Sequence, residues 1–173
     1  MTSITDHADP HECNPESFSD TIIAIDGNIQ LYQFLTAMRD NNGDLIRNDS
    51  GEPISHLLGM FNRTTSLLEH GIKPVYVFDG GYPDLKTEEV AERGDQRRNA
   101  QEKYEAAKER GDEEAMEKYG PRTSRITPQI QDETEMLLDC LGVPFVNSPS
   151  EVDPQVAVMV SDGPAEYGAT EDF

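Results

Sequence analysis

Acidic side chains follow the apolar segments of this chain at several separate places. Asp26 ends the run TIIAID, Asp79 ends KPVYVFD, Glu151 and Asp153 lie just beyond VPFVN, and Asp172 follows EYGAT. Carboxylates that share one crevice repel each other unless cations lie between them, and oxygen-only sites suit Mg²⁺ or Mn²⁺. If these acids meet in space, they could hold divalent ions that activate water and cleave a phosphodiester bond.

A structural interpretation of the same acids remains open. In a chain with 34 Asp and Glu residues, some acids end strands by chance, and Glu151 and Asp153 could simply cap a helix. For any single acid the structural interpretation is the simpler one. Several acids placed after the same kind of element favour the metal site.

The segments that would position these acids alternate between strand and helix patterns. Residues 21–26 and 73–79 are continuous apolar runs typical of buried strands, and each ends in Asp followed by glycine. Apolar residues at helical spacing follow, in one helix after Asp26 and in a second that we expect to begin near the candidate cap Ser50, with Pro53 in its first turn. We also expect a helix over 126–141, a short strand over 143–147, a helix opened by a capping box at Ser150, and a final strand over 166–170.

This alternation predicts an α/β fold, with a parallel sheet covered by helices on both faces. The segment from about 84 to 120 differs, because it is rich in helix formers but has few apolar residues at any period. A helix that is polar all round either bridges solvent or is unstable alone, so we expect an arm that leaves the core. Residues 1–20 have no apolar period, and we expect them to be a mobile acidic lead-in.

The composition of the chain excludes some classes of function. The chain has 173 residues, which suits one domain, and 14 Lys and Arg against 34 Asp and Glu give a formal charge of -20. This charge excludes a generic basic nucleic-acid-binding surface and suits a salt-rich cytoplasm, although an acidic protein from an ordinary host is the alternative. No stretch approaches the roughly 18 to 20 apolar residues that span a bilayer, so we expect no membrane partner and a location inside a prokaryotic cell.

Four segments, in this order and at this spacing, resemble the flap endonucleases of the XPG-type structure-specific nuclease family, and the likeness is greatest to archaeal members. They are AIDGNIQLYQFL, GEPISHLLGMFNRTTSLLEHGIKPVYVFDGG, LKTEEVAER with QRR behind it, and SPSEVD. The resemblance implies a PIN-like parallel sheet flanked by helices, with residues 84–120 as a protruding helical arch. It also implies two Mg²⁺ or Mn²⁺ ions and cleavage of DNA near a 5′ flap or junction, in replication and repair.

Residue roles follow from the same resemblance. Lys86 and Arg93 match the basic pair that contacts the scissile phosphate, and Tyr32 matches the aromatic on which a base stacks. Helical period alone would instead place Tyr32 in the core. The metal-site acids by this match are Asp26, Asp79, Glu151, Asp153 and Asp172, and the residues expected to bind DNA, besides Tyr32, are Arg39, Arg63, Arg97, Arg122 and Arg125. Arg97 could also be a solvated arm residue balanced by nearby acids.

The sequence departs from the family pattern at both ends. Family members have a second aspartate two residues after the position of Asp172, the usual Glu-x-Glu is Glu151-x-Asp153 here, and the clamp-docking tail is absent. The chain thus reads as C-terminally truncated relative to the family. Three hypotheses result: a minimal working nuclease, one half of a split nuclease that needs a separately encoded C-terminal half, or a catalytically impaired fragment that binds DNA junctions.

Overall fold

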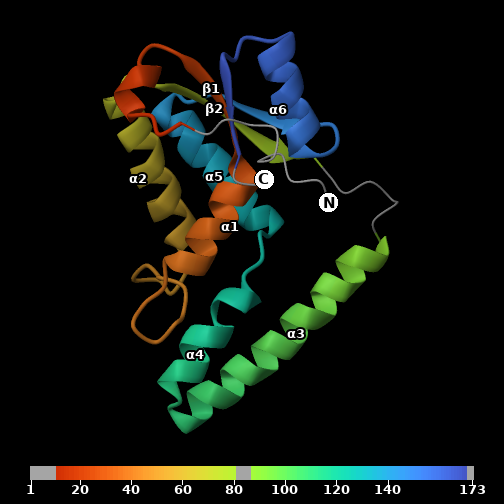
Figure 1. Cartoon of the computed structure of the whole chain (residues 1–173). Helices are drawn as coiled ribbons and strands as arrows, with labels where there is room; N and C mark the ends of the chain where they lie inside the picture. The colour runs from red at the N-terminus through yellow and green to blue at the C-terminus, as the bar shows by residue number, and fades with distance from the viewer. Residues whose placement is uncertain (1–10, 81–86, 171–173) are drawn as a thin grey trace. The chain divides into compact units, whose positions relative to one another are not determined.

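The computed structural model describes residues 11–80 and 87–170, with the backbone alone for residues 87–93. Two of its elements are short 3₁₀ helices, named η. In chain order the elements are η2 (Pro15–Phe18), β1 (Ile22–Asp26), α1 (Gly27–Ala37), α2 (Ser55–Glu69), β2 (Lys73–Asp79), α3 (Thr87–Arg110), α4 (Glu113–Tyr119), η4 (Pro121–Thr123), α5 (Pro128–Leu141), β3 (Phe145–Ser148), α6 (Val152–Ser161) and β4 (Tyr167–Ala169) (Figure 1).

The chain divides into two compact units. The first contains Met1–Ile29, Asn62–Gly81 and Leu138–Phe173, and it holds the four strands with α6. The second contains Gln30–Phe61 and Tyr82–Leu137, and it holds α3 and α4.

The four strands of the first unit form one parallel sheet in the order β3-β2-β1-β4. Asp26 at the end of β1 pairs with Val77 of β2, and Asp79 at the end of β2 pairs with Ser148 of β3. The predicted α/β class and the two predicted apolar strands are therefore confirmed. Because the strands are parallel, their carboxyl ends lie at one edge of the sheet, as the clustering of acids requires.

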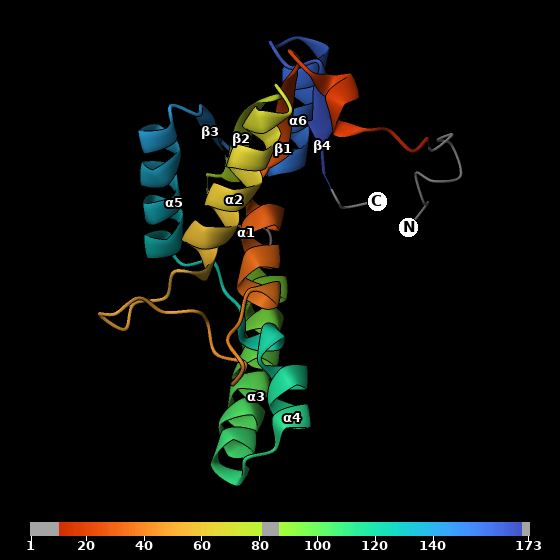
Figure 2. The same ribbon diagram turned by 90° about the vertical axis from the view of Figure 1, so that its left-hand side faces the viewer.

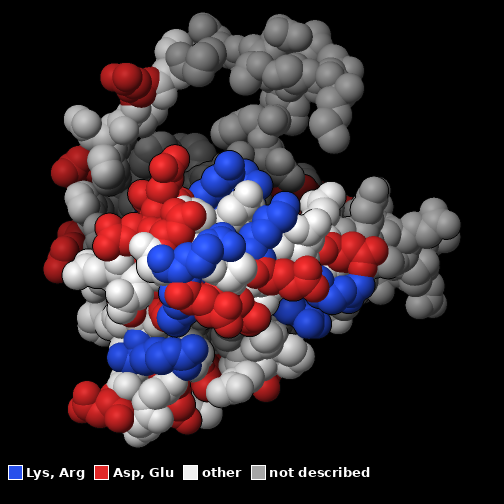
Figure 3. Space-filling view, turned by 90° about the horizontal axis from the view of Figure 1, so that it is seen from below, with Lys and Arg blue, Asp and Glu red and all other residues white. Residues whose placement is uncertain are grey.

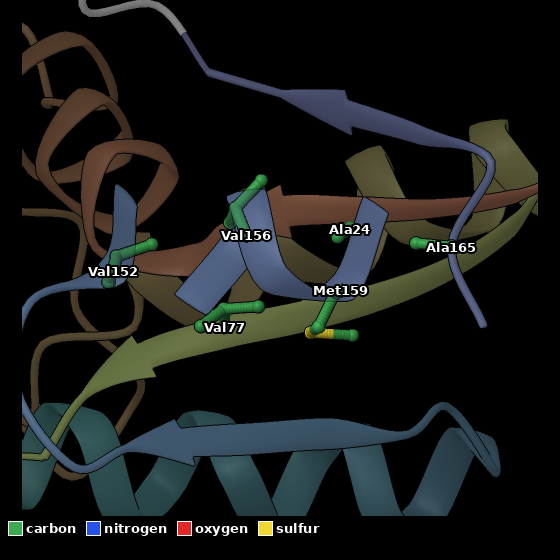
Figure 4. Packing of buried hydrophobic residues seen from close by; sticks show 6 residues of the cluster. All are labelled: Ala24, Val77, Val152, Val156, Met159 and Ala165. Carbon is green, nitrogen blue, oxygen red and sulfur yellow. The ribbon is translucent and has the colours of Figure 1, made fainter. Parts of the chain in front are cut away.

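Helix α6 packs against the strands of this sheet through one apolar face. Val152, Val156 and Met159 of α6 are buried, and their spacing of four and three residues brings them onto one side of the helix. They meet Ala24 of β1 and Val77 of β2 (Figure 4). Apolar burial of this kind fixes α6, and therefore the acids at its start, relative to β1 and β2.

Order in the first unit begins before Thr21, earlier than we expected. The 3₁₀ helix η2 covers Pro15–Phe18, and the Phe18 ring packs edge-on against Tyr167 of β4, with 5.1 Å between ring centroids. Asp20 N–H also donates to Gly71 O over 2.8 Å. A single aromatic residue thus anchors a segment whose composition alone indicated mobility.

Two predicted helix starts are wrong. Helix α2 begins at Ser55, and Pro53 lies before it in an isolated β-bridge with Arg47. The N-cap of α6 is Glu151, whose side chain makes no capping bond, so the capping box predicted at Ser150 does not form. The carboxylate of Asp79, from another strand, accepts the Val152 N–H instead.

The second unit contains a helical pair in which α3 and α4 lie side by side (Figure 2). The predicted helix is confirmed for α3, but the expectation that it has no core to join is wrong. Ala100, Tyr104 and Ala107 are buried along one stripe of α3. Two of these are alanines, whose small side chains gave too weak an apolar signal to be recognised as a packing face.

Candidate functional site

The two aspartates that end β1 and β2 lie at the same edge of the sheet, each followed by a glycine for which the packing leaves no alternative. A Cβ atom on Gly27 would approach the Phe78 ring to 2.3 Å, and one on Gly80 would lie 1.8 Å from Ser148 O. Side chains at these two positions would therefore displace the neighbouring strand ends. The Asp-Gly pairs of the sequence thus have a steric basis in the first unit.

Both carboxylate oxygens of Asp79 are held by hydrogen bonds. Asn28 Nδ2 donates to Asp79 Oδ2 over 2.6 Å, and the Val152 N–H donates to Asp79 Oδ1 over 3.1 Å. Asp26 Oδ1 accepts the N–H of Ile29 at the start of α1 over 2.9 Å. These bonds fix the orientation of both acids and join β1, β2 and α6 at this edge.

The acids at this edge act on one another electrostatically. Burial raises the pKa of Asp26, the N–H groups of Ile29 and Asn28 oppose this, and the charges of Asp153 and Asp79 raise it further. Burial likewise raises the pKa of Asp79, with added repulsion from Glu151 and Asp153. We name these four acids, Asp26, Asp79, Glu151 and Asp153, the carboxylate edge.

Ser148 orders the turn that presents the last two of these acids. Its hydroxyl donates to Glu151 O over 2.8 Å and accepts the Ser150 N–H over 3.2 Å, while the side chain is buried. Glu151 and Asp153 themselves are exposed. Their side chains are therefore accessible from solvent, whereas Asp26 is almost fully buried.

The donor set of the carboxylate edge suits a hard divalent cation. All four side chains offer carboxylate oxygens, their mutual repulsion is of the kind that a cation relieves, and Asn28 Oδ1 is a buried acceptor without a partner. Within residues 11–80 and 87–170, however, no three Asp, Glu, His or Cys side chains stand close enough together to hold an ion. The predicted ligand Asp172 and the predicted phosphate-contacting residues Lys86 and Arg93 lie outside the side chains that the structure describes.

The second unit contains a pocket of about 880 Å³ that is lined mainly by basic and aromatic side chains. We name it the basic pocket. Four of the residues predicted to bind DNA meet there: Tyr32, Arg97, Arg122 and Arg125. The complete lining is Tyr32 of α1, Gln96, Arg97, Asn99, Ala100 and Lys103 of α3, Tyr119 of α4, and Arg122, Ser124, Arg125 and Ile126.

Aromatic rings in the basic pocket are open to ligands. Tyr32 is 50% exposed, so the interpretation that placed it in the core by helical period is wrong. The Tyr119 ring has the Nζ atoms of Lys103 and Lys118 each 5.5 Å from its centroid and the Arg122 guanidinium 5.9 Å away. Three cations thus surround one ring, in the geometry of cation–π contacts. Figure 3 shows Lys and Arg side chains interleaved with Asp and Glu on the α3 and α4 side.

Two other predicted DNA-binding arginines lie elsewhere. The Arg39 guanidinium donates to Leu35 O over 3.2 Å, to Gly43 O over 2.8 Å and to Ser124 Oγ over 2.8 Å. Burial lowers the pKa of Arg39. Arg63 is an exposed residue of α2 in the first unit. Neither residue lines the basic pocket.

Sequence reasoning missed four residues of these two regions. Asn28 and Ser148 act through hydrogen bonds to residues distant in the chain or to a local turn, and Lys103 and Tyr119 meet only when α3 and α4 pack. The position of Asn28 was a usable signal. It comes two residues after Asp26, where the chain leaves the strand and begins a helix. Nothing in the local sequence indicated the other three.

Residues 2–100 match the family described as the XPG N-terminal domain. Flap endonuclease 1 of Schizosaccharomyces japonicus is 44% identical over 151 residues, covering 87% of this chain and 40% of that protein. Flap endonuclease 1 of Homo sapiens is 43% identical with the same coverage. This chain therefore spans about 40% of the length of the curated relatives it matches.

Solved structures show the same fold. Flap endonuclease-1 from Methanococcus jannaschii superimposes with a TM-score of 0.70 at 27% identity, covering 98% of this chain and 54% of that one. The catalytic core of Rad2 in complex with DNA substrate gives a TM-score of 0.63 at 32% identity, covering 91% and 41%. These similarities confirm the PIN-like α/β fold that the resemblance implied. Within the described residues, no helix has both the length and the apolar composition that crossing a bilayer requires.

Proposed function

The chain belongs to the family of the XPG N-terminal domain, and from this membership we propose that it is a divalent-metal-dependent nuclease that cuts DNA at 5′ flaps or junctions. The observation that carries the proposal is the carboxylate edge. Burial raises the pKa of Asp26 and of Asp79, the charges of neighbouring acids raise both further, and perturbed carboxylates gathered at one edge favour a functional site. Relatives that match this chain are flap endonucleases, and a similar solved structure is bound to DNA substrate.

Two Mg²⁺ or Mn²⁺ ions at the carboxylate edge would activate water and stabilise the charge that develops on the phosphate. Asp26, Asp79, Glu151 and Asp153 would hold them, together with Asp172. The protein's own part is orientation. Asn28 and the Val152 N–H fix the two oxygens of Asp79, and the Ile29 N–H fixes one oxygen of Asp26, so these two carboxylates are oriented before any ligand binds.

We assign the basic pocket to the single-stranded part of the substrate. Arg97, Arg122 and Arg125 provide charge for phosphates, and Tyr32 provides a half-exposed ring for a base. Lys86 and Arg93 would neutralise charge on the scissile phosphate, and Arg63 would add a further contact to DNA. In a chain of formal charge -20, local cations of this kind have to supply the attraction.

The test is cleavage of a labelled 5′-flap duplex by the purified chain in high KCl with Mg²⁺ or Mn²⁺. Asp79→Asn removes one charge from the carboxylate edge and keeps the size of the side chain. Asp162→Asn makes the same change at an exposed residue of the same unit, the C-cap of α6. Junction cleavage that is lost in Asp79→Asn and kept in Asp162→Asn supports the proposal, and equal cleavage by both variants would refute it.

Among residues 11–80 and 87–170, no three Asp, Glu, His or Cys side chains stand close enough together to hold an ion, and this favours a second candidate function, which is binding to DNA junctions without cleavage. The same substrate separates the two candidates, because binding in a gel-shift assay with no product supports the second one. Cleavage that appears only after a second polypeptide supplies the remaining part of the relatives' length would support a nuclease divided between two chains.

A salt-rich, archaeal cell interior is the setting we propose for this protein. The support is the acidic composition, with 34 Asp and Glu residues against 14 Lys and Arg residues. Salt at about 1 M shortens the Debye length to roughly 3 Å, so it screens the repulsion among these carboxylates. The midpoint temperature of unfolding should rise as KCl is increased toward molar concentrations. A midpoint that is independent of KCl would contradict this setting.

A further inference from the structure

A short turn in the second unit lies between two segments that line the basic pocket. In the turn Asp40–Asp44, Asp40 Oδ1 accepts the N–H groups of Asn42 and Asp44 over 2.8 and 3.0 Å. The Asp40 N–H donates to Asp44 O over 2.9 Å, and Gly43 has the positive φ of 77° that closes the turn. The turn is therefore internally bonded and well suited to hold other segments at fixed positions.

One side of the turn holds helix α3. Asp44 Oδ1 accepts the Tyr104 hydroxyl over 2.9 Å, Asp44 Oδ2 accepts Lys108 Nζ, and the Tyr104 hydroxyl is also 3.1 Å from Asn42 O. Tyr104 is only 5% exposed, so its hydroxyl depends on these partners.

The other side holds the segment that follows α4. Arg39, directly before the turn, donates through Nη1 to Gly43 O and through Nη2 to Ser124 Oγ, each over 2.8 Å. Ser124 Oγ in turn donates to Leu35 O over 3.0 Å. A lysine could not make these bonds together, because they use the planar fork of the guanidinium.

The two sides correspond to the two walls of the basic pocket. Residues 96–103 of α3 form one wall, and residues 119–126 form the other. Tyr104 and Lys108 continue the first wall along α3, and Ser124 belongs to the second. One turn is thus bonded to both walls, and it sets where Arg97 and Lys103 lie relative to Arg122 and Arg125.

We propose that the turn Asp40–Asp44 is the positioning element of the basic pocket, with Asp44 fixing the α3 wall and Arg39 fixing the opposite wall for a single-stranded nucleic acid. The inference rests on the proposed function for its ligand. It also gives Arg39 a different role from a phosphate contact, because three of its donors are already bonded within the protein. A pocket whose walls sample other positions binds more weakly in proportion to the fraction of competent molecules.

Substitution of Asp44 separates positioning from simple electrostatics by the sign of the effect. Asp44→Ala removes a negative charge, so Coulomb attraction alone predicts tighter binding of a polyanion. Positioning predicts weaker binding, because the Tyr104 hydroxyl and Lys108 lose their acceptor. The matched control is Asp49→Ala, an equal change of charge at an exposed residue of the same loop.

The experiment measures binding of a fluorescein-labelled oligothymidylate by anisotropy, well below the unfolding temperature of each variant. We expect Asp44→Ala to raise Kd about tenfold and Asp49→Ala to leave it equal or lower. Tyr104→Phe keeps the ring and removes only the hydroxyl, so it tests the same wall if Asp44→Ala does not fold. Arg39→Lys keeps the charge and should still weaken binding, whereas a role as charge alone predicts no change.

Hydrogen exchange of the α3 amides makes the positioning testable without a ligand. Residues 96–103 should exchange faster in Asp44→Ala and Tyr104→Phe than in the parent chain and in Asp49→Ala. Unchanged exchange together with unchanged or tighter binding in these variants would overturn the inference. Failure of the parent chain to bind any oligothymidylate, with exchange altered as expected, would instead refute the assignment of the pocket to nucleic acid.

Discussion

The two compact units of this chain handle charge in opposite ways. Of the 14 Lys and Arg residues, only Arg63 and Lys73 lie in the unit that contains the sheet, and all others lie in the unit that contains α3 and α4. The first unit buries Asp26 and places it near Asp79 and Asp153, whereas the second leaves its basic side chains largely exposed. The first unit suits cations, whereas the second also holds more acidic than basic residues, so only its basic pocket suits phosphates.

The difference also concerns how each charge is held. Carboxylates at the strand ends are oriented by backbone N–H groups and by Asn28, so their geometry is part of the sheet. Basic residues of the pocket extend from α3, which packs on α4, and from the segment after α4, and side-chain bonds of one turn reach both. The first arrangement is rigid and electrostatically unfavourable without cations, and the second is adjustable and favourable only toward an anion.

The largest effect should come from removing one charge of the carboxylate edge. Asp26→Asn should reduce flap cleavage by more than the roughly 10- to 100-fold that loss of an outer-sphere metal partner costs. The reason is that the remaining acids attract divalent cations less strongly. A single-turnover cleavage assay measures the loss, with Asp139→Asn, an exposed acid of the same unit, as control. Near-parental cleavage by Asp26→Asn would remove the functional contrast between the units.

A smaller effect should follow from changing the residue that orients Asp79. Asn28→Ala removes the 2.6 Å bond to Asp79 Oδ2 and should weaken Mn²⁺ binding about 10-fold, within the range for outer-sphere partners. Electron paramagnetic resonance of free Mn²⁺ gives the affinity without requiring cleavage. Asn62→Ala, at an exposed position of the same unit, should bind as the parent does. Equal affinity in both variants would show that the sheet alone orients the carboxylates.

A basic residue of the pocket should change the salt dependence of binding. Arg122→Gln should weaken oligothymidylate binding a few-fold and reduce the slope of log K against log salt by about 0.7, the value for one contact to single-stranded DNA. Arg110→Gln, at the end of α3 and outside the pocket lining, should leave the slope unchanged. Titrations at several KCl concentrations measure both slopes, and identical slopes would remove Arg122 from the interface.

The smallest effect is a contrast in pH dependence. The pKa of Asp26 is raised above the ordinary 3.8, so the metal-free protein loses stability as the pH rises from below 3.8 through the raised pKa. The pKa of Asp44 is lowered from 3.8, chiefly by its hydrogen bond from Lys108. Asp44 therefore stabilises the fold above pH 3.8, and this stabilisation is lost as the pH falls through the lowered pKa.

In EDTA at neutral pH, Asp26→Asn should therefore raise the unfolding midpoint and Asp44→Asn should lower it, each by a few degrees. Both differences should shrink in acid, and circular dichroism melts over a pH series measure them. Shifts of the same sign for the two variants would contradict the contrast between the units.

Sequence patterns predicted the first unit better than the second. The runs ending in Asp26 and Asp79 give strands because continuous apolar residues suit a buried parallel sheet, and β1 and β2 end at those aspartates. The cap of α6 could not be predicted, because its acceptor, Asp79, comes from a strand more than seventy residues earlier. The local sequence indicated Ser150 as the cap instead, because serine is a suitable N-cap residue, although the N-cap of α6 is Glu151.

In the second unit, the missed features depend on small or distant residues. The buried stripe of α3 contains two alanines, which weigh little in any apolar pattern, and its third member, Tyr104, is held by Asp44 from a distant loop. Helical period placed Tyr32 in the core, although Leu31, Phe34 and Leu35 are the apolar residues of α1 that are buried and Tyr32 is half-exposed. Helical periodicity predicts which face of a helix is buried, but it does not predict how wide the buried part of that face is.

The crowded environment of Tyr119 has an optical consequence. The chain contains no tryptophan, so Tyr119→Trp would introduce its only indole, in the pocket wall and beside Lys103, Lys118 and Arg122. Indole emission depends on the field of nearby charges. An anion that draws those cations away from the ring would therefore change the colour and the intensity of the emitted light, and the arrival of a ligand at this one wall could be followed in real time, with no label on the ligand.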